Sequence, residues 1–254
     1  SNMSLPVPML NIMNGGCHAN NNVDIQEFMI IPSNKFNFKD GLMKSVEVYT
    51  NLKSLLKEKG FSVSVGDEGG FAPNLKTSEE VLDLIILSIE RAGLIYLDDM
   101  SIALDCAASE LFSKDSYKLT GENKKFSSDE MVFYMQALVD KYEIKSVEDP
   151  FDEKDWDAWK TFTKNNNDLQ IVGDDIFVTQ EKILRKGIES KVANSILVKL
   201  NQVGTLSETM QAISLAKNSG YKTIISHRSG ETEDSFIADL AVAVDAGQIK
   251  TGAP

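Results

Sequence analysis

The stretch from Ser146 to Lys199 reads SVEDPFDEKDWDAWKTFTKNNNDLQIVGDDIFVTQEKILRKGIESKVANSILVK, and it carries the pattern from which the fold can be predicted. Three short apolar runs in it each end in a charged residue. SVE ends at Glu148, QIVGD at Asp174 and SILVK at Lys199. A segment long enough for a helix separates each run from the next. Buried strands that alternate with helices are typical of a parallel sheet, whose carboxyl ends meet at one edge.

The same pattern continues on both sides of this stretch. Upstream, SIALD ends at Asp105; downstream, YKTIIS ends at Ser226 and GQIK ends at Lys250. A (β/α)8 barrel of the TIM type gathers the ends of successive strands at one mouth. The sequence therefore predicts an α/β barrel whose mouth holds three acids and two lysines, which suits a divalent metal and an anionic substrate.

The beginning of the chain departs from this alternation. PMLNIMN, ending near Asn14, and DIQEFMIIP, over residues 24–32, both read as strands. Only about nine residues separate them, whereas a parallel crossover needs a dozen or more, so the second strand should be antiparallel. A helix is predicted over Asp40–Lys59 and another after Thr77. The barrel should thus open with a ββαα unit.

Three helices are predicted from capping boxes, in which a Ser or Thr oxygen accepts from the backbone three residues on and a Glu reaches back. The pairs are Thr77 with Glu80, Ser127 with Glu130, and Thr205 with Glu208. Gly93 and Gly220 follow two of these helices, as C-terminal capping glycines do. No change of composition suggests a linker, so we expect residues 1–254 to form one domain.

Composition limits the classes of function. With 254 residues, 42% of them apolar, the chain can bury a sizeable core. The formal net charge of −12 argues against direct nucleic-acid binding. The two cysteines, Cys17 and Cys106, are expected as reduced thiols rather than a disulfide. No apolar run is long enough to span a membrane and no signal peptide opens the chain, so we expect a cytoplasmic protein.

The strand-end residues suggest metal and proton-transfer chemistry. Asp105, Glu148 and Asp174 offer the hard oxygen ligands that Mg²⁺ prefers. The alternative is that these acids cap helices or pair with lysines of the barrel. Lys199 could act as a base if a metal and Lys250 lowered its pKa, or it could serve only as the partner of a carboxylate.

Three loops add further candidates. GDEGGFAP, over residues 66–73, could place Glu68 over the mouth as a general acid, or could be an ordinary surface loop. SHRSGETED, over residues 226–234, could hold a phosphate through Arg228 and Ser229. The alternative is that Arg228 pairs with a nearby acid, namely Glu231, Glu233 or Asp234. His18 in the first hairpin loop could be structural or functional.

Taken together, eight segments resemble the C-terminal barrel domain of the enolase family, and they occur in the family's order. They are LNIMNGGCHANNNVDIQEFMI, GDEGGFAPNL, ALDCAASE, VEDPF, VGDDIFVT, ILVKLNQVGTLSET, SHRSGETEDSFIADLAVA and GQIKTG. They cover nearly the whole chain. The resemblance implies the family's barrel, which also opens with a ββαα unit.

The resemblance implies reversible dehydration of 2-phospho-D-glycerate to phosphoenolpyruvate in glycolysis and gluconeogenesis. Lys199 would be the base and Glu68 the acid, and Asp105, Glu148 and Asp174 would bind the first Mg²⁺. A second Mg²⁺ would need the substrate and a serine from the family's N-terminal domain. The substrate-binding residues would be His18, Gln26, Glu27, Ser226, His227, Arg228, Ser229 and Lys250.

The chain departs from the family's pattern at both ends. It has no counterpart of the N-terminal α+β domain, and it stops at Pro254, before the family's last barrel helix. We therefore expect a fragment with little activity of its own, from a parent that is a homodimer or a larger homo-oligomer. By family analogy alone, a parent enzyme could join an RNA-degradation complex or bind plasminogen at the cell surface. The alternatives for the chain are another dehydratase of the superfamily and a non-catalytic interaction role.

Overall fold

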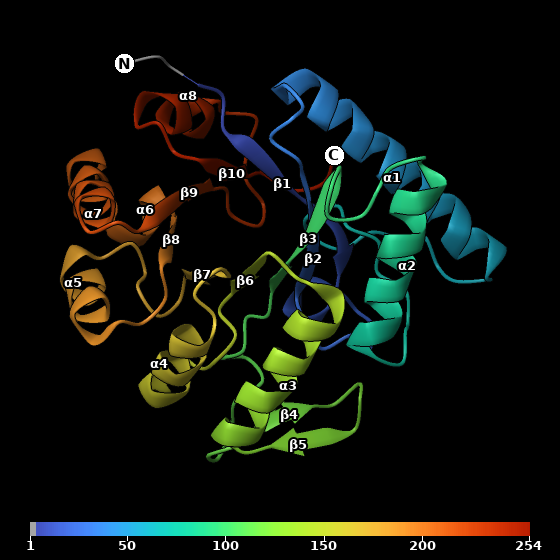
Figure 1. Cartoon of the computed structure of the whole chain (residues 1–254), viewed down its shortest axis with the longest axis horizontal. Coiled ribbons are helices and arrows are strands. Elements are labelled where there is room, and N and C mark those ends of the chain that lie inside the picture. The colour runs from blue at the N-terminus through green and yellow to red at the C-terminus, as the bar shows by residue number, and fades with distance from the viewer. Residues whose placement is uncertain (1–3) are drawn as a thin grey trace.

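Eight strands close into a barrel in residues 4–254, which are the residues that the structure, a computed structural model, describes. Around the barrel the strands follow the order β1-β10-β9-β8-β7-β6-β3-β2 (Figure 1). This confirms the predicted (β/α)8-type architecture. The strands are β1 (Val7–Asn14), β2 (Glu27–Pro32), β3 (Met100–Asp105), β6 (Ser146–Glu148), β7 (Gln170–Gly173), β8 (Ser195–Val198), β9 (Lys222–Ser226) and β10 (Gln248–Lys250).

The second strand is antiparallel, as the short loop before it predicts. β2 runs against both β1 and β3, whereas the other neighbours in the barrel are parallel. Because β2 is reversed, its first residue lies at the mouth where the parallel strands end. The register accordingly pairs Glu27 with Asp105 of β3.

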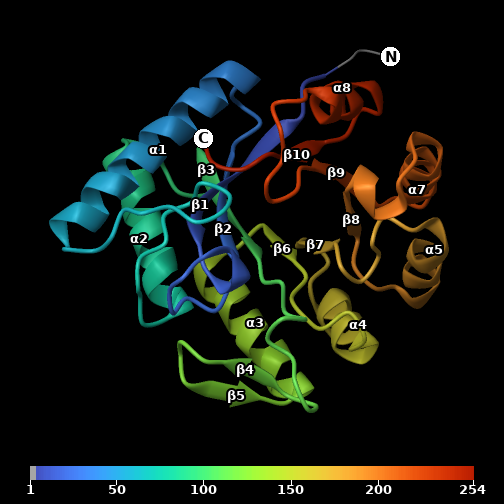
Figure 2. The same cartoon turned by 180° about the vertical axis from the view of Figure 1, so that it is seen from behind.

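Helices surround the barrel on the outside, as the views from the front and from behind show (Figures 1 and 2). Two of them lie between β2 and β3, which confirms the ββαα opening. None of the helices in the described part of the chain is both long and apolar enough to cross a membrane. They are α1 (Phe38–Glu58), α2 (Ser78–Arg91), α3 (Ser128–Tyr142), α4 (Trp156–Asn165), α5 (Glu181–Ser190), α6 (Leu200–Val203), α7 (Leu206–Asn218) and α8 (Phe236–Ala243), with a short 3₁₀ turn, η1 (Gly16–His18).

The predicted helix caps form in full or in part. At α3 the capping box is complete, since Ser127 accepts from the backbone of Glu130 and the Glu130 carboxylate accepts from the backbone of Ser127. At α2 only half of it forms. Thr77 accepts from the Glu80 N–H, but the Glu80 carboxylate accepts from the backbone of Lys76 instead.

The last of the three caps and both capping glycines are also present. Thr205 accepts from the backbone N–H of Glu208 at the start of α7. Gly93 and Gly220 follow α2 and α7 with φ values of +73° and +78°, the left-handed conformation that glycine adopts most readily. Predicted boundaries therefore agree closely with the observed helices here.

Apolar side chains fill the barrel interior below its mouth. Successive side chains of a strand point to opposite faces, so every second side chain points into the barrel. Two residues after the apolar inward position, the next inward side chain lies at the mouth. Asp105 follows Ala103 in this way, Lys199 follows Leu197, and Ser226 follows Ile224. The interior layer consists of Met9, Met29, Ile31, Ala103, Val172, Leu197 and Ile224. A larger apolar layer packs between the strands and the helices.

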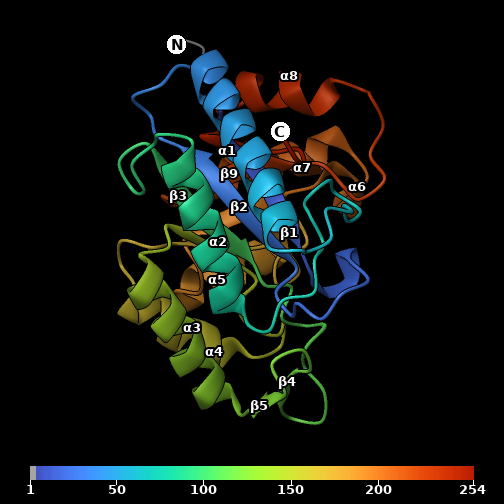
Figure 3. The ribbon, with the colours of Figure 1, turned by 90° about the vertical axis from the view of Figure 1, so that its right-hand side faces the viewer.

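A small hairpin was not predicted. β4 (Tyr117–Leu119) and β5 (Lys124–Phe126) pair with each other outside the barrel and lie beside α3 (Figure 3). Asp24 anchors its turn, because the Asp24 carboxylate accepts from the backbone of Gly121 at 3.0 Å and of Glu122 at 3.1 Å. Strands of three residues are too short to show a clear period in the sequence.

Candidate active site

Lys250 lies at the centre of the barrel mouth. Its side chain is 3% exposed, and its Nζ donates to Asp105 Oδ2 at 2.8 Å and to the Glu148 carboxylate at 3.0 and 3.1 Å. Glu27 Oε2 is 3.3 Å away. Burial alone would lower the pKa of Lys250, but Asp105, Glu148 and Glu27 outweigh it and raise this pKa well above its usual value. The group is therefore an ammonium ion enclosed by carboxylates.

Lys199 forms the second ion pair of the mouth. Its Nζ donates to Asp174 Oδ2, and Gln202 Nε2 donates to the other oxygen of Asp174 at 2.9 Å. Burial lowers the pKa of Lys199 and Lys250 acts in the same direction, as expected, but Asp174 and Glu148 raise it more. In this arrangement, without a metal, the attraction of the two acids outweighs the repulsion from Lys250 and the pKa of Lys199 is raised.

Two of the three strand-end acids have pKa values that are shifted in opposite directions. Burial raises the pKa of Glu148 well above its usual value, and the nearby Asp105 raises it further. Burial would also raise the pKa of Asp105, but Lys250 outweighs this effect and the pKa is lowered. Glu148 is fully buried and Asp105 and Asp174 nearly so, and all three offer hard oxygens.

The three strand-end acids offer oxygen donors that suit a divalent cation, but their side chains are not already arranged around one common point. Asp105 and Glu148 share Lys250, whereas Asp174 holds Lys199. Within residues 4–254, two other groups of acids and histidines have ligand atoms within 4.8 Å of one another. One group is His18, Glu27 and Glu68, and the other is Asp149, Asp174 and Asp175. The buried carboxylates already bind positive charge, which is what a metal site requires.

The glycine-rich loop after α1 folds over the mouth. The Asn14 side chain accepts from the backbone of Gly70 at 2.9 Å, and the Tyr49 hydroxyl donates to the Gly69 carbonyl at 2.6 Å. A Cβ atom at Gly66 would lie 2.5 Å from the His18 carbonyl oxygen, so only glycine allows this close approach. The loop brings Glu68 to the mouth, where its side chain is 6% exposed.

Glu68 contacts both histidines and a serine. Ser229 Oγ donates to Glu68 Oε1 at 3.1 Å, His227 Nε2 lies 3.3 Å from Glu68 Oε2, and His18 Nδ1 lies 4.0 Å from Glu68 Oε1. Burial would raise the pKa of Glu68, but the contact with His227 and other nearby groups lower it well below its usual range. The expectation of a protonated Glu68 is therefore not met here, because the surrounding donors stabilise the carboxylate.

The neighbouring Glu27 is the acid that gains a proton more readily. Burial raises the pKa of Glu27 to about 7, although Lys250 and His18 oppose this. His18 Nδ1 lies 3.4 Å from Glu27 Oε1, so Glu27 links the ammonium group of Lys250 to the histidine of the first hairpin loop.

A small hollow of about 140 Å³ lies between these groups. Every residue that lines it was predicted from the sequence as a catalytic, substrate-binding or metal-binding residue, although these residues are far apart in the chain. Glu148 and Asp174 lie behind this lining, in contact with the two lysines. The lining residues are His18, Gln26, Glu27, Glu68, Asp105, Lys199, Ser226, His227, Arg228, Ser229 and Lys250.

The loop after β9 places its side chains in different ways. Ser226 Oγ donates to the His227 carbonyl at 2.9 Å, and Ser229 Oγ lies 3.2 Å from His18 Nε2. Arg228 is exposed, and its Nη1 donates to Asn201 Oδ1 at 3.1 Å. Among the described residues, Arg228 has no ion pair with the acids that follow it, so its guanidinium group keeps donors for another partner.

Asp149 is a residue of this site that the sequence reasoning did not select. Its carboxylate accepts from the backbone of Asp174 at 2.9 Å and of Asp175 at 2.8 Å, and its own φ is +41°. It thereby ties the end of β6 to the end of β7. In VEDPF, Asp149 directly follows Glu148 at the end of a predicted strand, and this pair of adjacent acids is the sequence signal that could have identified it.

The comparisons with known proteins agree on one family. The family model described as "Enolase, C-terminal TIM barrel domain" matches residues 2–254. An enolase of Natranaerobius thermophilus is 54% identical over 255 residues, which cover 100% of this chain and 60% of that protein. An enolase of Legionella pneumophila is 55% identical over 251 residues, which cover 98% of this chain and 60% of that protein. The chain thus spans about 60% of the length of these curated relatives.

Proposed function

Because this chain belongs to the enolase family and corresponds to its C-terminal barrel domain, we propose that the protein containing it reversibly dehydrates 2-phospho-D-glycerate to phosphoenolpyruvate and water. The observation that carries this proposal is the arrangement at the mouth. The buried ammonium group of Lys250 and the partly buried one of Lys199 lie among strand-end carboxylates, and Glu68 lines the same small hollow. Such a site can bind an anion and move protons on either side of it.

Lys199 is the proposed base. A proton next to a carboxylate is very weakly acidic, and its removal places about two negative charges on the carboxylate oxygens. A base must be neutral to accept that proton, so Lys199 would first have to leave its ion pair with Asp174 and lose its own proton to solvent. Cationic groups near the new charge favour the reaction, and Lys250, which lines the same hollow, would supply one.

Mg²⁺ is the proposed cofactor, with Asp105, Glu148 and Asp174 as the residues that would hold it. When bound, the metal would stabilise the charge that develops on the substrate carboxylate, as Mg²⁺ does in enolase-superfamily sites generally. The buried hard-oxygen donors and their existing cationic partners support this assignment. A second Mg²⁺, bound with the substrate, is part of the same proposal.

The remaining residues have proposed roles in leaving-group chemistry and binding. Glu68, a carboxylate in this arrangement, would first take up a proton and then give it to the departing hydroxyl. Ser229 Oγ donates to Glu68 Oε1, and His18 Nδ1 lies 4.0 Å from the same oxygen. Arg228 would bind the phosphate in a bidentate manner, with Ser229 beside it. Gln26, Glu27, Ser226 and His227 line the same hollow and would complete the substrate site. We further propose that the whole protein is a cytoplasmic homodimer or larger homo-oligomer.

An assay of phosphoenolpyruvate formation by the whole protein tests this proposal. We expect turnover of 2-phospho-D-glycerate, and a loss of about 10²–10⁴-fold in kcat for Lys199→Ala and for Glu68→Gln, the range typical of general acid–base catalysis. Lys186→Ala is the matched control, because Lys186 lies on the outer helix α5. Turnover of a sugar acid with none of 2-phospho-D-glycerate, or full activity of Lys199→Ala, would overturn the assignment.

A further inference from the structure

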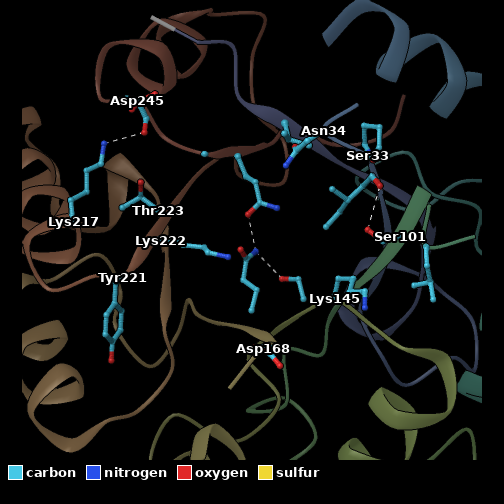
Figure 4. A pocket seen from close by; sticks show the side chains of 18 residues that line it. Ser33, Asn34, Ser101, Lys145, Asp168, Lys217, Tyr221, Lys222, Thr223 and Asp245 are labelled. Atoms are coloured by element: carbon cyan, nitrogen blue, oxygen red, sulfur yellow. Dashed lines mark hydrogen bonds between the residues drawn. The ribbon is translucent and has the colours of Figure 1, made fainter. Parts of the chain in front are cut away.

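A second hollow, of about 690 Å³, lies at the opposite end of the barrel (Figure 4). Residues at the beginnings of β6, β7, β9 and β10 line it, together with the end of β2. The apolar interior layer, with Met9, Met29 and Leu197, lies between this hollow and the mouth. Barrel enzymes carry their active sites at the carboxyl ends of the strands, so this hollow is separate from the catalytic site.

The floor of this hollow is a built polar surface. Gln170, which is 7% exposed, donates from its amide nitrogen to Ser146 Oγ at 3.0 Å and to Gln248 Oε1 at 2.8 Å. These two bonds fix the orientation of both amides. The Gln248 amide nitrogen and the hydroxyl of Thr223, a residue only 4% exposed, then have no hydrogen-bond partner among residues 4–254. Both groups line the hollow and are therefore available to a bound polar molecule.

Two lysines give the hollow positive charge. Lys222 precedes Ile224 by two positions on β9, so it shares the inward face of the strand, and Figure 4 shows its side chain reaching toward the middle of the hollow. Lys145 lines the side of the hollow. Both lysines are exposed, and neither pairs with an acid in the described part of the chain, so their ammonium groups are free to bind a ligand.

The other charged residues of the lining are engaged or peripheral. Lys217 donates to the carbonyl oxygens of Val244 and Asp245, and the Asp245 carboxylate accepts from Ser4 Oγ at 3.0 Å. Asp168 lies at the margin of the hollow (Figure 4). The free groups of the lining are therefore mainly donors, namely the ammonium groups of Lys145 and Lys222 and the amide nitrogen of Gln248.

We propose that this hollow binds a small organic anion, with its carboxylate or phosphate group on Lys222 and Gln248 and its hydroxyl groups on Gln170 and Thr223. The size supports a metabolite rather than a single ion, because ligand pockets for small molecules typically enclose about 300–1,000 Å³. The bound molecule would not take part in the reaction proposed for the mouth. It would add a second, independent ligand to the protein.

Calorimetric titration of the whole protein with inorganic phosphate and with citrate tests the proposal. The background is Arg228→Met, which removes the phosphate contact proposed at the mouth. We expect one oxyanion to bind per chain on this background. Adding Lys222→Met should weaken binding at least about tenfold, because a hydrogen bond to a charged group is lost. Lys145→Met should weaken it less, and Lys186→Met, on the outer helix α5, should not change it.

The two probes also distinguish the source of the charge. Binding of phosphate alone identifies a phosphorylated ligand, and binding of citrate alone identifies a carboxylate. Lys222→Gln, which keeps a polar side chain at this exposed position, provides a second variant with the same expected loss. The proposal is overturned if neither probe binds to the Arg228→Met protein. It is also overturned if Lys222→Met and Lys222→Gln, each combined with Arg228→Met, bind the probe as tightly as Arg228→Met alone.

Discussion

At the scale of single residues, the mouth of the barrel alternates positive and negative side chains. Lys250 joins carboxylates from β2, β3 and β6, and Lys199 joins one that follows β7. Burial makes an unpaired charge expensive, so each of these groups depends on its partner. The same pairing favours the protonated form of Lys199, the proposed base. A cation bound by Asp174 would compete with this ion pair, so the proposed mechanism links cation binding to deprotonation of Lys199.

Asp174→Asn tests the proposed metal ligand, which also forms an ion pair with Lys199. The amide removes one negative charge and one hard oxygen ligand, so we expect Mg²⁺ affinity to fall at least about tenfold. Isothermal titration with Mg²⁺ measures this directly. Asp168→Asn is a matched control, since Asp168 lies beside the hollow at the other end of the barrel. Unchanged Mg²⁺ affinity in Asp174→Asn would exclude Asp174 as a ligand.

Asp149→Ala tests the tie between β6 and β7. The substitution leaves the backbone N–H groups of Asp174 and Asp175 without an acceptor, and each unsatisfied buried group costs roughly 1–3 kcal/mol. Asp149→Asn should lose less, because it keeps one acceptor oxygen and asparagine tolerates a positive φ. Urea unfolding of both variants gives the difference. Equal stability of the alanine variant and the wild type would mean that these bonds contribute nothing.

The sequence reveals the charged residues of the site far better than their contacts. Asp105 and Lys199 stand out because a charge ends an apolar run, and the period of a strand places it inward. Asp149 is not predicted, because its carboxylate accepts from backbone N–H groups, and such contacts require no particular residue types that could be recognised in the sequence. The directions in which the pKa values of Glu68 and Lys199 shift in this arrangement could not be predicted from the sequence, since they depend on neighbours that only the fold brings near.

At the scale of helices and strands, caps and loop lengths are informative. The short first loop correctly predicts an antiparallel β2, and Ser127 correctly marks the start of α3. The hairpin of β4 and β5 is missed, because it is fixed by distant contacts rather than by its own sequence. Asp24, far away in the chain, holds its turn.

Ser127→Ala tests the complete capping box of α3. The variant leaves helix N–H groups without their acceptor, so we expect a loss of about 1 kcal/mol in the free energy of unfolding. Ser128→Ala, one residue further on and inside the helix, is the matched control and should change stability little. Urea unfolding measures both. A loss for Ser128→Ala that equals the loss for Ser127→Ala would contradict the role of the cap.

Glu122 connects the hairpin to two helices and should make stability depend on pH. It accepts from Ser78 at the start of α2 and from the Tyr134 hydroxyl of α3. Burial would raise its pKa, but Lys124 and these donors lower it below the value in the unfolded chain. The stabilisation is therefore present above the unfolded pKa and disappears as the pH falls through the folded pKa.

Glu122→Gln measures that contribution. We expect the variant to be less stable than the wild type at pH 7, and the difference between them to shrink as the pH falls below about 4. Glu143→Gln, at the C-terminal end of α3, serves as a control, because the Glu143 side chain accepts no hydrogen bond from the described residues. A difference in unfolding free energy that stays constant from pH 7 to pH 3 would show that the Glu122 charge does not matter.

At the scale of the whole molecule, closure of the barrel joins the two ends of the chain. β1 pairs with β10 in parallel, with Met9 opposite Lys250. The barrel can be predicted from the alternation of strands and helices, and the grouping of charges at one mouth follows from it. The polar hollow at the other end could not be predicted, because the glutamines and lysines that line it carry no recognisable spacing.

Lys250→Met tests how far the mouth stabilises the closed barrel. Without the ammonium group, three buried carboxylates from three strands lose their shared cation, and removing one partner of a buried ion pair costs about 3–5 kcal/mol. Urea unfolding in the presence of a chelator should show this loss at pH 7. Lys222→Met is the matched control, because it removes an exposed lysine from the same barrel and should change stability by less than about 0.5 kcal/mol.

Added Mg²⁺ then separates the charge of Lys250 from its packing. A metal that binds only the folded state stabilises it by mass action, and it should do so more strongly where the carboxylates have lost their ammonium partner. We therefore expect saturating Mg²⁺ to increase the unfolding free energy of Lys250→Met by more than that of the wild type. If the increase is no larger than in the wild type, the loss of stability comes from packing, and the carboxylates of Glu27, Asp105 and Glu148 do not act together as a cation site.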